Sequence, residues 1–198
     1  MMFERLQHLS AELSAREIAG SVRILPAAHI FQRDEITAFE AVVYNPVICL
    51  ILQGRKEMHF GDRLVSLAEG DALLVSHDLP VTSKITEASS DAPYRALILS
   101  LDVGILRSLY EQVGDTVSDA HDAKSLSASV ADPAWVDPIL RYLELMDAPL
   151  DVKVLGPMIL REIHYRLLLS PIGGMLRNLL SVDSHASRIA KSIQQIRI

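Results

Sequence analysis

Residues 45–80 read NPVICLILQGRKEMHFGDRLVSLAEGDALLVSHDLP, and this stretch decides the fold that the sequence predicts. Three turns, each containing a glycine, divide it into four short apolar segments, which is the pattern of successive antiparallel strands. The first segment, residues 47–52, is apolar at every position and contains three β-branched side chains, so we expect it to be buried on both faces. The stretch therefore predicts a β-meander whose first strand lies in the middle of a sheet or barrel.

The second segment predicts a half-exposed strand. In residues 56–60, Met58 and Phe60 alternate with Glu57 and His59, so one face of the strand is apolar and the other is polar. We expect the apolar face to lie toward the core.

Further strand-like segments lie on both sides of the meander. Residues 22–25 and 29–31 have the composition of first strands, residues 81–87 alternate, and residues 94–101 form a last long apolar strand. From Asp102 the apolar period changes from two to about 3.6, and we expect the chain to be helical from there to its end. The predicted fold class is α+β, with an antiparallel β-barrel followed by an α-helical subdomain.

These patterns divide the chain into parts. Residues 1–20 predict an N-terminal amphipathic helix that ends at a glycine, residues 21–101 predict the barrel, and residues 102–182 predict the helical packing and dimerisation subdomain. Residues 115–132 are small and polar, and we expect a loop there. A helix that begins near residue 189 stops in mid-period at residue 198, which is typical of a truncated chain.

The clearest helical stripe follows Asp132 and Pro133, which are suited to the first positions of a helix. Two interpretations are open for it: a dimer interface, because Trp and Tyr often anchor interfaces, or packing on the next helix within one subunit. The stripe consists of Trp135, Ile139, Tyr142, Leu143 and Met146.

Composition indicates a cytoplasmic globular protein. Hydrophobic residues make up 49% and charged residues 22% of the chain, and no apolar run reaches the roughly 18 residues that a membrane span needs. We therefore expect no membrane partner. The single cysteine, Cys49, excludes an internal disulfide and is expected in the core. The net charge is −6, with 12 basic against 23 acidic residues in 1–152 and 7 against 2 in 153–198.

Sequence motifs for catalysis and for cofactors are absent. The chain has no G-x-S-x-G, P-loop or G-x-G-x-x-G motif, and the only two histidines of the meander, His59 and His77, lack the H-x-H pair of cupin metal sites. Glu162 and His164 do not complete an H-E-x-x-H motif, and Glu162 instead suits an ion pair with Arg166. We expect no catalytic residues, no metal and no cofactor.

The segment QGRKEMHFGDRLVSLAEGDALLVSHDLPV, residues 53–81, resembles the amino-terminal sensor domain of AraC-type transcriptional regulators. PYRAL at residues 93–97, LREIHYRLL at 160–168 and RIAKSI at 188–193 follow in the family's order. The resemblance covers most of residues 40–198. It departs from the family at residues 68–70, where Ala-Glu-Gly replaces a common Pro-Gly turn, and in lacking the two helix-turn-helix motifs.

The resemblance implies a cupin-like barrel, or double-stranded β-helix, that binds a small-molecule effector. It also implies a homodimer that binds DNA through a missing C-terminal domain, with residues 183–198 as the start of the linker or first helix, and RNA polymerase as a partner of the full-length protein. Without that domain, we expect the chain not to bind DNA specifically. Other interpretations are a cupin-fold enzyme and a stand-alone small-molecule-binding protein. Candidate ligand-binding residues in the barrel are Arg33, Gln53, His59, His77 and Tyr94.

Overall fold

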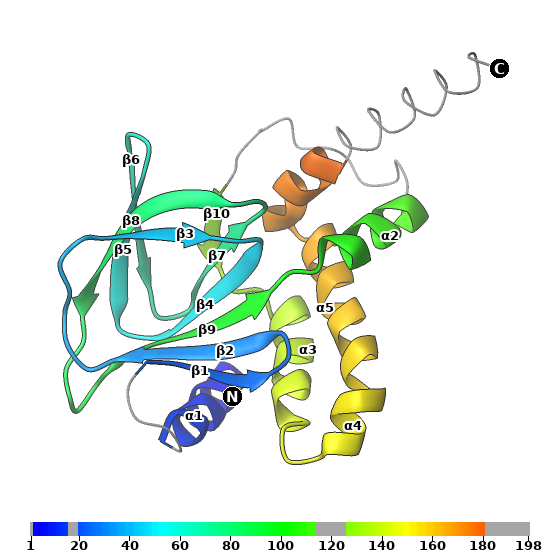
Figure 1. Ribbon diagram of the computed structural model, residues 1–198, viewed down its shortest axis with the longest axis horizontal. Coiled ribbons are helices and arrows are strands. Elements are labelled where there is room, and N and C mark those ends of the chain that lie inside the picture. The colour runs from blue at the N-terminus through cyan, green and yellow to red at the C-terminus, as the bar shows by residue number, and fades with distance from the viewer. Residues whose placement is uncertain (1, 16–19, 114–125, 181–198) are drawn as a thin grey trace.

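The computed structural model describes residues 2–15, 20–113 and 126–180, and two antiparallel sheets form its centre (Figure 1). Among these residues the larger sheet has the strand order β1-β2-β9-β4-β7-β10, and the smaller has the order β3-β8-β5-β6. The strands are β1 (Gly20–Leu25), β2 (Ala28–Arg33), β3 (Glu40–Tyr44), β4 (Val47–Gln53), β5 (Arg55–Phe60), β6 (Arg63–Ala68), β7 (Asp71–Val75), β8 (Leu79–Glu87), β9 (Tyr94–Ser100) and β10 (Leu126–Val130).

Helices cover the larger sheet on the side away from the smaller one. Figure 1 shows most of them gathered beside the strands, with α1 below the β1–β2 hairpin. The helices are α1 (Met2–Ala15), α2 (Val103–Val113), α3 (Pro133–Glu144), α4 (Pro149–Val154) and α5 (Gly156–Leu169), followed by the 3-10 turn η2 (Pro171–Gly173). The predicted α+β class, a cupin-like pair of antiparallel sheets followed by packed helices, is confirmed.

Strand β4 is buried on both faces, as its composition predicts. Ile48 and Leu50 point to the helical layer, whereas Cys49 and Ile51 belong to the cluster between the two sheets. Cys49 is 2% exposed, so its predicted core position is confirmed. Because neighbouring side chains on a strand point to opposite faces, the larger sheet separates two hydrophobic cores.

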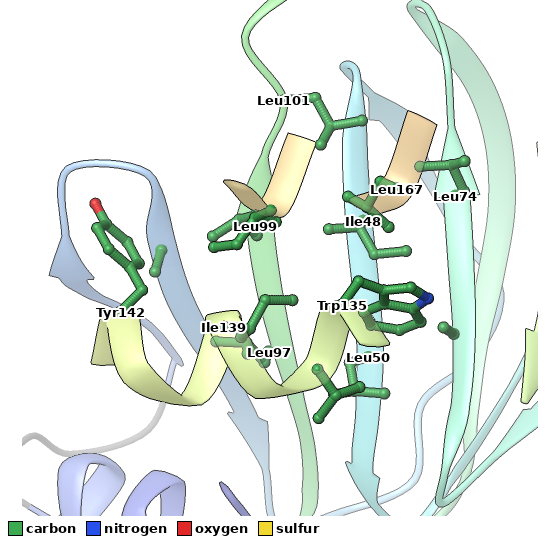
Figure 2. Packing of buried hydrophobic residues seen from close by; sticks show 14 of the residues in the cluster. Ile48, Leu50, Leu74, Leu97, Leu99, Leu101, Trp135, Ile139, Tyr142 and Leu167 are labelled. Carbon is green, nitrogen blue, oxygen red and sulfur yellow. The ribbon is translucent and has the colours of Figure 1, made fainter. Parts of the chain in front are cut away.

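Helix α3 carries the apolar stripe into the subunit core. Asp132 caps the helix by accepting a hydrogen bond from the Ala134 amide, with Pro133 in the first turn. Figure 2 shows the side chains of Trp135 and Ile139 among those of the sheet strands. Four residues of the stripe have at most 1% of their surface exposed: Trp135, Ile139, Tyr142 and Leu143.

That burial favours the second interpretation of the stripe, packing within one subunit. Met146 is half-buried and packs against the edge of the same core. Large aromatic side chains are common both in cores and in interfaces, so residue type alone does not distinguish the two interpretations.

Strand β10 corrects the expected loop at 115–132 and the expectation of helix throughout the C-terminal half. Residues 126–130 pair antiparallel with β7 along its whole length. Alternating small and polar residues have weak strand propensity of their own, and the free edge of β7 supplies the partner. Strand β3 and helix α4 were likewise not among the predicted elements. The predicted helix at residues 189–196 lies outside the described residues.

Two side chains of helix α5, Glu162 and His164, connect it to neighbouring elements. Arg166 pairs with Glu162 at 3.7 Å, as predicted, and Arg141 of α3 binds the same carboxylate at 2.7 Å. His164 is buried, and its Nε2 accepts a hydrogen bond from the Asp102 amide at 2.8 Å. This contact joins α5 to the end of β9 and the start of α2.

Candidate effector-binding cavity

A cavity of about 200 Å³ opens between the two sheets. Its walls come from β2, β4 and β9 of the larger sheet, from β3, β5 and β8 of the smaller sheet, and from the segment before β3. The lining residues are Phe31, Arg33, Thr37, Glu40, Val42, Tyr44, Cys49, Lys56, Ser83, Lys84, Ile85, Tyr94, Ala96 and Ile98. Most of this lining is apolar, which is typical of a small-molecule site with a few polar groups.

Lys56 is the deepest charged group of this lining. It lies on β5 two residues before Met58, so the strand's alternation points both side chains inward, and Lys56 is 7% exposed. Its ammonium donates a hydrogen bond to the Tyr44 hydroxyl oxygen, with 2.5 Å between Nζ and Oη. The ammonium also lies 5.2 Å from the centre of the Tyr44 ring. A buried, positively charged end of the cavity results.

Burial and neighbouring groups act in opposite directions on the ionisable groups of the cavity. Burial lowers the pKa of Lys56, but the Tyr44 and Cys49 side chains raise it, and the net pKa lies above its ordinary value. Burial raises the pKa of the Cys49 thiol and of the Tyr94 phenol. At neutral pH the cavity therefore contains a charged amine, a neutral thiol and a neutral phenol.

Two further cations line the cavity, and both have their own contacts. The ammonium of Lys84 lies 3.0 Å from a Glu57 carboxylate oxygen and 4.7 Å from the centre of the Phe39 ring. The exposed Arg33 guanidinium lies 5.8 Å from the centre of the Phe31 ring. Neither group is buried as Lys56 is.

The structure brings together two of the five residues that the sequence proposes for ligand binding. Tyr94, which is 1% exposed, and Arg33 both line the cavity. Gln53 instead accepts a hydrogen bond from the buried Arg95 at 3.0 Å and lines a separate surface depression. His59 and His77 lie outside the lining and are exposed.

The outward position of the two histidines has a simple cause. His59 follows the polar face of β5 and lies 4.9 Å from the Phe39 ring, while His77 lies after the end of β7 beside the Ser76 hydroxyl. They do not line the cavity between the sheets.

The main residue that sequence reasoning missed is Lys56. The alternation that places Met58 and Phe60 inward also places Lys56 inward, because residues i, i+2 and i+4 share a face. Because lysine side chains mostly lie in solvent, residue type predicts an exposed Lys56, whereas strand alternation predicts a buried one. Tyr44, its partner, lies on β3, a strand that was not among those predicted.

No three or more His, Cys, Asp or Glu side chains of the described segments come together in an arrangement that could hold a metal ion. Within the same segments, no helix combines the length and the hydropathy needed to cross a lipid bilayer.

The family comparison identifies the chain. A family profile described as "AraC-type transcriptional regulator N-terminus" matches residues 24–175. Because the match covers most of the sequence, the chain belongs to this family. It is a family of transcription factors rather than of enzymes, as predicted. No curated protein sequence gives a significant match.

Solved structures that resemble this chain have low sequence identity to it. Apo ToxT K231A from Vibrio cholerae strain SCE256 is 12% identical, with a TM-score of 0.50 over 76% of this chain and 57% of ToxT. ToxT of that strain bound to an unsaturated fatty acid is 14% identical (TM-score 0.39; 84% and 54% covered). A cupin superfamily protein from Desulfitobacterium hafniense DCB-2 is 20% identical, with a TM-score of 0.32 over 48% of this chain and 88% of that protein. This chain thus matches little more than half of ToxT's length.

Proposed function

We propose that this chain is the effector-sensing and dimerising part of a cytoplasmic AraC-type regulator. A small molecule binds in the cavity between the sheets and controls an attached helix-turn-helix domain that binds DNA and acts on RNA polymerase. Membership of the family supports this role. The observation that carries the proposal is the cavity itself, which combines an enclosed apolar lining with the buried ammonium of Lys56.

The position of the cavity supports a role in sensing. Its floor is formed by β4 and β9, whose opposite faces carry the helical layer. Cys49 lines the cavity, whereas Ile48 and Leu50 on the same strand pack on the helices. Because protein interiors are close-packed, a displacement of β4 by a ligand is passed to the side chains on its other face.

A thermal-shift screen of small metabolites tests the proposal, with a variant that closes the mouth of the cavity. Val42 lines the cavity and is 37% exposed, so Val42→Trp fills its opening while disturbing the core little. The neighbouring Val43 is 62% exposed and outside the lining, so Val43→Trp is the matched control. A compound that raises the Tm should lose its effect only in Val42→Trp. Equal responses in both variants would place the site elsewhere.

The family's role also implies a two-fold dimer, since paired helix-turn-helix modules read two half-sites. With the α3 stripe buried, we propose that a second copy binds the exposed apolar face of α4 and α5. Leu150, Val154 and Met158 follow one another at intervals of four and are 73%, 56% and 66% exposed. Tyr165 and Leu169 continue this face along α5 at 38% and 36% exposure. Large exposed apolar side chains gathered on neighbouring helices are candidates for an interaction site.

Sedimentation measurements of Met158→Asp test the dimer surface. The substituted carboxylate would be desolvated in the interface, so we expect a folded monomer. Leu64→Asp is the matched control, because Leu64 is also exposed, at 55%, but lies on β6. A Met158→Asp chain that self-associates as strongly as the wild type would rule this surface out.

A further inference from the structure

The buried ammonium of Lys56 lacks an anionic partner in the part of the chain that the structure describes. Its partner there is the Tyr44 hydroxyl, and no carboxylate in the described segments forms an ion pair with it. Burying a charge is costly unless that charge is paired and hydrogen-bonded. Lys84, the other lysine of the lining, does have such a partner, because its ammonium lies 3.0 Å from a carboxylate oxygen of Glu57. Lys56 therefore has unused capacity to bind an anion.

Lys56 and Tyr44 together form a pair of donors suited to a carboxylate. Lys56 donates one of its three N–H groups to the Tyr44 oxygen, which leaves two N–H groups and the Tyr44 O–H to donate elsewhere. A carboxylate has two acceptor oxygens, so it can accept one hydrogen bond from each side chain, and bonds to a charged group are the stronger kind. The neutral thiol of Cys49 and phenol of Tyr94 do not supply the missing negative charge.

The size and lining of the cavity restrict the rest of the ligand. Its volume of about 200 Å³ lies below the roughly 300–1,000 Å³ of pockets that enclose drug-sized ligands. The large side chains of the wall that offer apolar surface include Phe31, Ile85, Tyr94 and Ile98. The enclosed part of the ligand must therefore be small and apolar.

We propose that the effector is a compact monocarboxylate, with one ring or a short branched chain. Its carboxylate binds Lys56 and Tyr44, and its apolar body lies against Phe31, Ile85 and Ile98. This inference rests on the proposed effector role of the cavity and adds the chemical class of the ligand. A long-chain fatty acid exceeds the cavity's volume of about 200 Å³.

Calorimetric titration of the whole chain with matched acids and amides tests the ligand class. The probes are benzoate, phenylacetate and 3-methylbutanoate, each beside its own neutral amide, with a sixteen-carbon monounsaturated fatty acid as the long comparison. We expect at least one compact acid to bind about tenfold or more tightly than its amide, since a tenfold ratio corresponds to one charge-assisted contact. Lys56→Met should reduce that ratio to about one, and Lys84→Met should preserve it.

The stability of Lys56→Met gives a second, ligand-free measurement. Methionine fills a similar volume without a charge, so the ligand-free variant should have a Tm equal to or above that of the wild type. A lower Tm would mean that the ammonium serves the fold, and would overturn the proposal.

The remaining outcomes separate the ligand class from the function. Equal binding of acids and amides, tighter binding of the fatty acid, or no binding of any compact acid would overturn the carboxylate proposal. The effector role would stand in each case if another compound lost its thermal shift in Val42→Trp but not in Val43→Trp. If no compound passed that comparison, the proposed function itself would fail.

Discussion

Replacing Ile139 by alanine should destabilise the subunit strongly, because its side chain lies between α3 and the larger sheet. Ile139 is 1% exposed, and Figure 2 shows it beside Leu97. Truncation of a buried isoleucine to alanine costs about 2–5 kcal/mol, through lost apolar contact and the cavity left behind. Since domains are stable by only about 5–15 kcal/mol, this is a large share of the total.

Urea unfolding can measure this loss with the protein's own fluorescence. Trp135 is the single tryptophan of the chain and lies one turn before Ile139 on α3. With an m-value of about 2–3 kcal/mol per molar urea, the unfolding midpoint should fall by about 0.7–2.5 M. Leu64→Ala is the control, because Leu64 is 55% exposed and should change stability by at most about 0.5 kcal/mol.

The reasoning would be refuted if Ile139→Ala unfolded at the wild-type urea concentration but weakened self-association. That result would mean that the stripe of α3 contacts a second copy rather than the sheet. Measuring both variants at several protein concentrations separates the two effects, since the stability of an obligate dimer depends on concentration.

Three further predictions concern the backbone and the helical layer. Burial lowers the pKa of His164, so the folded protein keeps its imidazole neutral while the unfolded chain binds a proton below about pH 6.5. The free energy of unfolding should therefore fall as the pH drops through that value, and it should fall less in His164→Gln. Unfolding measurements at a series of pH values test this. Gly54→Ala should lower the Tm more than Gly61→Ala, since φ is positive at both but only at Gly54 would the new Cβ meet a carbonyl oxygen, at 2.5 Å. Arg177→Ala removes the donor to the Leu168 and Ser170 carbonyls, and calorimetry should show a loss of about 1–3 kcal/mol.

The sequence was most informative where a strand is buried on two faces or where a turn needs glycine. The unbroken apolar run of β4 has one explanation, a central strand, and Gly54 and Gly70 take the positive φ that their turns require. These signals are local, because each feature is formed by the same short segment of sequence that predicts it. The same is true of Asp132, whose capping role follows from its place before Pro133.

Other features depend on partners that are distant in sequence. Strand β10 has little intrinsic preference for extended structure and exists because β7 has a free edge. The inward direction of Lys56 follows from strand parity, but its tolerance in the interior depends on Tyr44 from another strand. The amide oxygen of Gln53 accepts a hydrogen bond from Arg95 on the neighbouring strand, a contact that its own place in the sequence does not indicate.

The pairing of β10 with β7 also bears on the order in which the chain folds. Until residues 126–130 have left the ribosome, β7 lies at the edge of its sheet, where unpaired amides and carbonyls invite aggregation. The contact joins segments far apart in sequence, so it forms late and favours a folding unit that includes both the strands and α3. An isolated barrel should therefore be expressed to a point beyond Val130, and not to residue 101, where the strand pattern ends.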